Sequence, residues 1–203
     1  MKQNMEEIIR TRLQESAAIK LALVDDDILI HKVTELSDEI INCIAKGGKL
    51  AVCGNGGSAT DAIHFSGEVV GRFQRERRPW PVISLNADIS ILTGIANDYG
   101  YEDVYARQVQ AYLREGDILL GISTSGNSEN VLRAVQMARK MGVRTAALLG
   151  KDGGRIGGTV DIPVIVPNNV TARVQEVHIT LIHILCELLE ERLCGDDGDR
   201  SKV

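Results

Sequence analysis

The chain has 203 residues, a formal net charge of −5 and only 3% aromatic residues. This length suits one domain with a sizeable core, and an aliphatic composition is typical of helices packed on a sheet. The negative charge and the lack of a long basic run argue against binding to nucleic acid or an anionic membrane. No apolar run approaches 18 residues, so a membrane span is not expected. The N-terminus is charged and has no apolar h-region, so export is not expected either. Four cysteines without C-x-x-C spacing indicate reduced thiols and a cytoplasmic location.

Two helices are predicted ahead of the first strand. Residues 5–23 carry apolar side chains at helical intervals among charges, and a second helix is predicted from Ile28 to Ala45, ending at Gly47-Gly48. An α/β core does not need both helices. Their apolar faces could therefore pack on the chain's own sheet or form a subunit interface.

The stretch from Leu50 to Gly71 predicts a strand, a tight turn and a helix. An apolar run, LAVC, leads into Gly54-Asn55-Gly56-Gly57, and Ser58 stands at a helix N-cap position. Glycines allow the backbone to approach a ligand closely, and a helix N-terminus favours an anion. The residues alone therefore predict a phosphate at this loop.

His64 and Glu68 lie four residues apart on that helix, so their side chains share one face. They form an ionisable pair about a turn beyond the glycine loop. The spacing fits a catalytic or metal site, and it also fits a hydrogen-bonded surface pair.

The next segment holds a basic cluster, a strand and a turn. The RERR cluster at Arg75–Arg78 could bind phosphate or an acidic partner, although an exposed, solvated loop is the usual explanation of such a run. A second strand is predicted over Val82–Leu85, followed by a short helix that begins at Asn86-Ala-Asp88. The turn-forming cluster Ala96–Gly100 is predicted to interrupt two helical segments, with Asn97 and Asp98 as cap residues.

A hydroxyl-rich turn follows the third predicted strand, Asp117–Ile122, and precedes a helix that ends near Met141. Hydroxyl donors and backbone N–H groups together suit the three oxygens of a phosphate monoester. Phosphate binding is the favoured interpretation of this turn. Its hydroxyls belong to Ser123, Thr124, Ser125 and Ser128.

Two more strands, Val143–Leu149 and Ile162–Val166, complete an alternation of strands and helices that predicts βαβ units and a parallel sheet. Ligands of such sheets bind beyond the carboxyl ends of the strands. The glycine loop and the hydroxyl-rich turn both follow strand ends, so one pocket can use both.

A final helix is predicted from Thr171 to Leu193. At 100° per residue Glu176 nearly coincides with His183, while His178 lies about 140° away from it. The two histidines are therefore not expected to serve one site. His183 is either a core histidine bonded to a carbonyl or a functional residue, and the polar tail 195–203 is expected to be disordered.

In combination these motifs resemble the phosphoheptose isomerase family, a branch of the sugar isomerase (SIS) fold. The resemblance covers residues 1–194, nearly the whole chain. It rests on CGNGGS at Cys53–Ser58, the helix with His64 and Glu68, AND at Ala96–Asp98, ISTSGNS at Ile122–Ser128 and RVQEVHITLIHIL at Arg173–Leu185.

The resemblance implies a single SIS domain over 1–194, an α/β/α fold with a five-stranded parallel sheet, assembled as a homotetramer with active sites at subunit interfaces. It moves the phosphate from the glycine loop to Ser123, Thr124, Ser125 and Ser128. It assigns Glu68 and His183 as the acid/base pair, and His64, Glu68, Gln175 and His183 as ligands of one zinc ion per subunit. The resemblance thus assigns Gln175 to the site of His183, whereas helical phase alone favours Glu176. Glutamine is an unusual zinc ligand. Sugar contacts are assigned to Asn55, Gly56, Gly57, Asn97, Asp98 and Gln175.

The implied activity is the isomerisation of sedoheptulose 7-phosphate to D-glycero-D-manno-heptose 7-phosphate through an enediol, the first step of bacterial heptose biosynthesis. One alternative is a non-catalytic SIS tetramer that binds a protein partner, similar to the replication-initiator-associating type. That branch lacks the histidine found here at position 183. A sugar-phosphate sensor without turnover is a third possibility.

Overall fold

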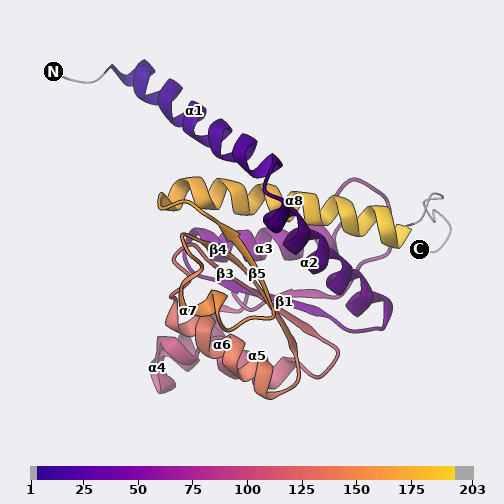
Figure 1. Cartoon of the computed structure of the whole chain (residues 1–203). Coiled ribbons are helices and arrows are strands. Elements are labelled where there is room, and N and C mark those ends of the chain that lie inside the picture. Colours follow the sequence, from indigo (N-terminus) through magenta and orange to yellow (C-terminus); the bar gives the residue numbers. More distant parts are fainter. Residues whose placement is uncertain (1–3, 195–203) are drawn as a thin grey trace.

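A computed structural model describes residues 4–194 and shows a parallel five-stranded sheet between two layers of helices (Figure 1). The strand order is β2-β1-β3-β4-β5, and every neighbouring pair is parallel. The sheet confirms the predicted α/β/α class. Its strands are β1 (Leu50–Gly54), β2 (Val82–Ser84), β3 (Ile118–Ser123), β4 (Arg144–Gly150) and β5 (Ile162–Val166).

The register of the central strands brings the two predicted ligand loops to one edge of the sheet. Gly54 at the end of β1 pairs with Ile122 near the end of β3. The glycine loop and the hydroxyl-rich turn therefore leave adjacent strands side by side. This arrangement confirms the prediction that both loops lie at neighbouring carboxyl ends.

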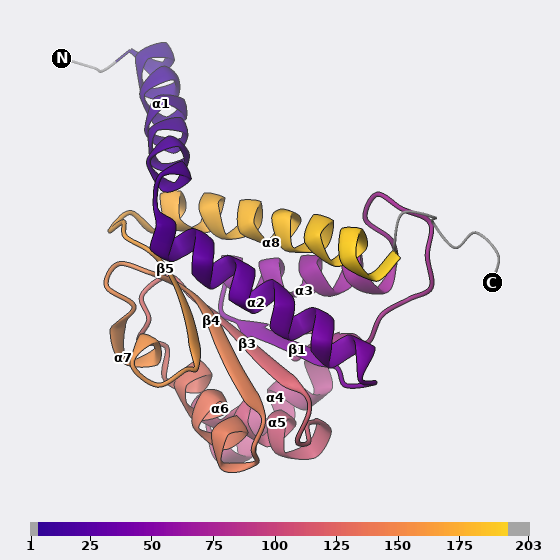
Figure 2. The same cartoon turned by 45° about the vertical axis from the view of Figure 1, so that its right-hand side comes forward.

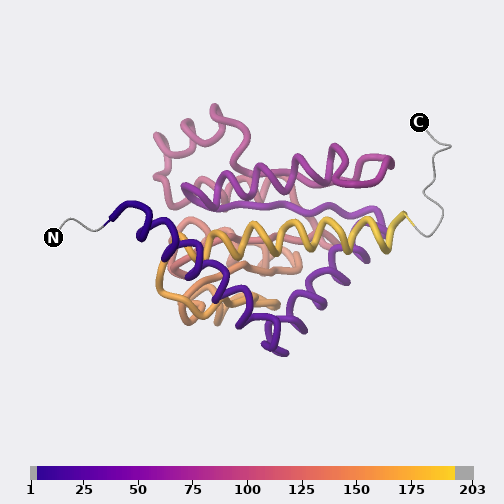
Figure 3. Tube along the Cα trace, turned by 90° about the horizontal axis from the view of Figure 1, so that it is seen from above, coloured from indigo at the N-terminus to yellow at the C-terminus, as the bar shows by residue number. Residues whose placement is uncertain are grey.

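Helices cover both faces of the sheet, and each face has its own aliphatic core (Figure 2). On one face α8 (Thr171–Cys194) lies between α2 (Asp27–Ala45) and α3 (Gly57–Val70) (Figure 3). The opposite face carries α4 (Ile89–Tyr99), η1 (Tyr101–Asp103), α5 (Ala106–Tyr112), α6 (Glu129–Lys140) and α7 (Gly154–Gly157).

The first helix, α1 (Met5–Val24), projects away from this body (Figures 1 and 2). None of its residues is buried, and Ile19 and Leu23 are its partly buried contacts with the core. Its remaining apolar side chains face outward. Between residues 4 and 194 no helix is long and apolar enough to cross a membrane.

The predicted helix and strand ends agree with the structure to within about two residues. The cluster Ala96–Gly100 separates two helical segments as predicted, because α4 ends at Gly100, whose φ of +98° breaks the helix. The cap role predicted for Asn97 and Asp98 is wrong, since α4 continues through Tyr99. The short helix α7 was not predicted. The tail 195–203 lies outside the described residues.

Candidate active site

Three ionisable side chains meet where α3 and α8 pack together. His64 Nε2 lies 3.1 Å from His183 Nε2 and 3.2 Å from Glu68 Oε1. The side chains of His64 and Glu68 are 44% and 28% exposed, so this cluster opens to the surface. The pair expected from its four-residue spacing thus has a third member that is more than 100 residues away in sequence.

The two histidines of α8 have separate environments. His178 is fully buried, its ring nitrogen lies 3.1 Å from the Leu149 carbonyl oxygen, and burial lowers its pKa to about 4. His183 is half-buried on another side of the helix. The prediction that the two histidines do not share a site is confirmed, and His178 is the core histidine.

Phe73 completes the surroundings of His183, and sequence reasoning missed it. The Phe73 ring stacks on the imidazole with a centroid distance of 5.6 Å and an interplanar angle of 26°, while the His64 ring lies at 5.2 Å. The His183 ring therefore has two aromatic neighbours, Phe73 and His64. The sequence signal that could have identified Phe73 is an aromatic, apolar residue close to the charged run 75–78.

Gln175 lies apart from this cluster within one chain. Its side chain packs on Gly57 at the start of α3, where an added Cβ would lie 2.5 Å from Gln175 Nε2. Eight helical residues separate it from His183, a rise of about 12 Å. One chain therefore gathers three of the four predicted zinc ligands, and the role of Gln175 stays a prediction for a site shared with a second copy. Glu176, which helical phase favours as the partner of His183, instead forms an ion pair with Arg173.

The cluster has the donor types of a zinc site. Ligand atoms around a tetrahedral zinc at 2.0–2.1 Å are about 3.4 Å apart, close to the separations around His64 Nε2. Nevertheless, over residues 4–194 no group of three or more His, Cys, Asp or Glu side chains is placed so that it could hold a metal ion. The donors therefore suit zinc in kind, but the side chains as they are placed do not form a metal site.

Asn55 in the glycine loop is held by a polar network. Asn55 and Asn130 exchange two amide hydrogen bonds of 2.8 and 2.9 Å. The hydroxyls of Tyr101 and Tyr105 donate to Asn55 Oδ1 at 3.1 and 3.2 Å. The loop is thus pre-positioned from the opposite layer, which leaves the exposed backbone of Gly56 and Gly57 open to a ligand.

The side-chain hydroxyls converge in the hydroxyl-rich turn after β3, Ser123–Ser128, which is called the serine-rich turn from here on. Ser123 Oγ lies 2.9 Å from Ser128 Oγ and 3.5 Å from Ser125 Oγ. Ser128 is the N-cap residue of α6, but its hydroxyl turns toward Ser123 instead of capping the helix. The first N–H groups of α6 and three hydroxyls therefore lie together, an arrangement that suits a phosphate.

A second loop braces this turn. Gly126 has a φ of +66°, and a Cβ there would collide with the Gly153 carbonyl. Arg155 donates its backbone N–H to Asn127 Oδ1 at 3.1 Å. The segment after β4 therefore fixes the shape of the serine-rich turn. The contact between these two loops was not predicted from the sequence.

Asn97 and Asp98 lie exposed in the last turn of α4, where the Asn97 amide donates to Asp98 Oδ1 at 2.8 Å. The helix ends just before Tyr101, whose hydroxyl reaches Asn55. This end of α4 is therefore tied to the glycine loop. Their proposed contact with the sugar stays a prediction.

The sheet order, the paired loops at its edge and the sequence together define a SIS-domain protein, since a family model described as SIS domain matches residues 16–150. The phosphoheptose isomerase of Trichlorobacter lovleyi is 49% identical over 191 residues, covering 94% of this chain and 96% of that protein. A phosphoheptose isomerase from Francisella tularensis superposes with a TM-score of 0.90 at 34% identity, covering 94% of this chain and 100% of the other. The Neisseria gonorrhoeae enzyme gives 0.87 at 39% identity, with 92% and 99% covered. The chain belongs to the phosphoheptose isomerase family.

Proposed function

We propose that the protein is an aldose–ketose isomerase that converts sedoheptulose 7-phosphate to D-glycero-D-manno-heptose 7-phosphate through an enediol, the first step of bacterial heptose biosynthesis. The observation that carries the proposal is the cluster in which His64 contacts both His183 and Glu68, in a chain of this family. A carboxylate and an imidazole are the groups that a two-step proton transfer requires.

Glu68 removes the proton from the carbon beside the ketose carbonyl and returns a proton to the neighbouring carbon. His183 moves protons to and from the two oxygens, since an imidazole nitrogen can accept or donate. Ser123, Thr124, Ser125 and Ser128 hold the phosphate, whose binding energy orients the open-chain sugar. The glycine loop binds the sugar hydroxyls.

We further propose one zinc ion per subunit, held by His64, Glu68 and His183. When bound, zinc would polarise the carbonyl and stabilise negative charge on its oxygen. A carboxylate that binds zinc is a weaker base, so metal content and turnover must be measured on the same Glu68 variant. Gln175 would join the site from a second copy.

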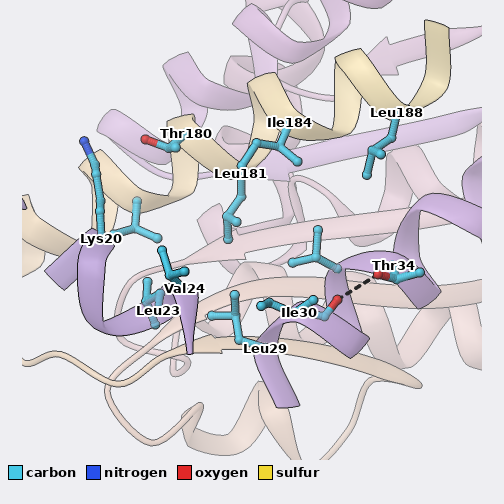
Figure 4. A pocket seen from close by; sticks show the side chains of 12 residues that line it. Lys20, Leu23, Val24, Leu29, Ile30, Thr34, Thr180, Leu181, Ile184 and Leu188 are labelled. Carbon is cyan, nitrogen blue, oxygen red and sulfur yellow. Dashed lines mark hydrogen bonds between the residues drawn. The ribbon is translucent and has the colours of Figure 1, made fainter. Parts of the chain in front are cut away.

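We also propose a cytoplasmic homotetramer. Support for the assembly comes from a cavity of about 390 Å³ between α1, α2 and α8, beside outward-facing apolar side chains of α1 (Figure 4). Free cysteines agree with a reducing compartment. The cavity is lined by Lys20, Leu23, Val24, Leu29, Ile30, Val33, Thr34, Val177, Thr180, Leu181, Ile184 and Leu188.

Incubation of the purified protein with sedoheptulose 7-phosphate and zinc tests the activity, with the aldose product followed by NMR. We expect turnover by the wild type, and a loss of about 10²- to 10⁴-fold in Glu68→Gln and His183→Ala, because each removes one proton-transfer group. Glu187→Gln, an exposed change on α8, is the matched control. A wild type that binds the sugar phosphate without turnover would instead support a sensor or a partner-binding role.

A further inference from the structure

One member of the basic cluster at 75–78 is buried, so the expectation of a solvated loop is wrong for Arg77. Its side chain is 5% exposed and forms an ion pair with Glu190 of α8, which is 3% exposed, at 3.0 Å. The guanidinium also stacks on Trp80, 3.8 Å from the ring centroid. A buried ion pair has a large desolvation cost, which only excellent geometry and further hydrogen bonds offset.

Glu190 supplies those hydrogen bonds to the loop between α3 and β2. Its carboxylate accepts three consecutive backbone N–H groups, from Phe73 at 3.1 Å and from Gln74 and Arg75 at 2.9 Å each. Burial alone would raise the pKa of Glu190, yet these donors and Arg77 hold that pKa below its usual value. The Glu190 carboxylate therefore holds in place the backbone segment that carries the Phe73 side chain.

Arg77 fixes the other end of the same loop to α3. Its guanidinium donates to the carbonyl oxygens of Glu68 at 3.0 Å and Val69 at 2.9 Å. The last carbonyls of a helix lack partners within the helix, and a cation is favoured beside them. Arg77 therefore holds the helical turn on which Glu68 lies.

We propose that Glu190 and Arg77 are positioning residues for the proposed isomerase. Glu190 places Phe73 against the His183 ring, and Arg77 places the backbone of Glu68, so one buried ion pair sets the geometry of the acid/base pair. The inference rests on the proposed function. The effect of the ion pair on the position of the His183 ring can also be measured without enzymatic turnover.

Steady-state kinetics of Glu190→Gln and Arg77→Lys give the first test. We expect kcat to fall about 10- to 100-fold, because small misplacements of reacting groups have effects of this size, with KM changed less than about twofold. Asp117→Asn is the matched control. Asp117 is 1% exposed, pairs with Lys49 at 2.6 Å and accepts the backbone N–H of Arg114 at 2.9 Å, away from the histidines. It should lose comparable thermal stability with kcat unchanged.

Phe73 gives the conservative comparison. Phe73→Tyr keeps a ring on His183 and should retain kcat within about twofold, whereas Phe73→Leu should fall as Glu190→Gln does. Phe73 is half-buried, so both variants should fold. Equal kcat in Phe73→Leu and Phe73→Tyr would overturn the role given to the ring.

NMR of metal-free protein with ¹³Cε1-labelled histidine, at one fixed pH, separates this inference from the proposed function. The chain has four histidines, so the His183 signal can be assigned with His183→Ala. In Glu190→Gln and Arg77→Lys this signal should shift as the ring current of Phe73 is lost, while Asp117→Asn leaves it in place. An unchanged signal in both variants would overturn the inference, whether or not the wild type turns over sugar.

Discussion

Gly57 is the residue that sets the position of Gln175, because it leaves no side chain between the start of α3 and the glutamine amide. Gly57→Ala should displace Gln175 and lower kcat/KM by about tenfold or more. Gly67→Ala, on the same helix with nothing within 4 Å of the added Cβ, is the control. It should keep full activity and gain up to about 1 kcal/mol of stability. Full activity in Gly57→Ala would show that Gln175 has no role in the site.

His178 makes the stability of the fold depend on pH. Its pKa is about 4 in the folded chain because of burial, against 6.5 in the unfolded chain. Between these values the unfolded chain binds the extra proton, so the free energy of unfolding should fall by up to roughly 3 kcal/mol as pH drops from about 6.5 to 4. Urea titrations at several pH values measure this slope. It should be smaller in His178→Gln, and an equal slope in the variant would assign the effect to other groups.

At the scale of elements, the serine-rich turn depends on the loop after β4. Gly126→Ala should raise KM for the sugar phosphate about tenfold or more, because the added Cβ would push the turn off Gly153 and spread the three hydroxyls. Gly47→Ala has a similar positive φ of +80° but no neighbour within 4 Å of the Cβ, so it reports the backbone strain alone. Activity assays with thermal melts separate the two effects. A rise in KM of the same size in Gly47→Ala would contradict this explanation.

The sheet and its helices could be predicted from local signals. Apolar runs, glycine turns and capping residues locate β1, β3 and α6, since these patterns act within a few residues. The pairing of His64 with Glu68 also follows from helical spacing. The contact of His64 with His183 does not, because it depends on how α3 packs against α8.

Long-range polar contacts account for what sequence reasoning missed. In the sequence, Arg77 looks like one of several exposed charges. It is buried in the fold, where it pairs with Glu190, 113 residues later in the chain. The bracing of Asn55 by Asn130 is likewise set by the fold. Spacing also could not place Gln175, because its neighbour Gly57 belongs to another helix.

At the scale of the whole molecule, α1 is a helix without a buried residue of its own. If its apolar face joins copies of the chain, Leu13→Glu with Leu21→Glu should reduce the proposed tetramer to smaller species, since both side chains are more than 65% exposed in the single chain. Light scattering measures the mass. Ile89→Glu, which is 74% exposed at the start of α4 in the opposite layer, should leave the assembly intact. A tetramer that survives both changes in α1 would place the interface elsewhere.

Running the reaction in D₂O tests whether Glu68 moves a proton through an enediol. We expect the wild-type product to carry deuterium at C2, because the abstracted proton exchanges with solvent on the carboxylate before it is returned. Glu68→Gln should show neither turnover nor deuterium exchange at C1 of the ketose. Turnover by the wild type without any deuterium in the product, or exchange by Glu68→Gln at the wild-type rate, would contradict this role of Glu68.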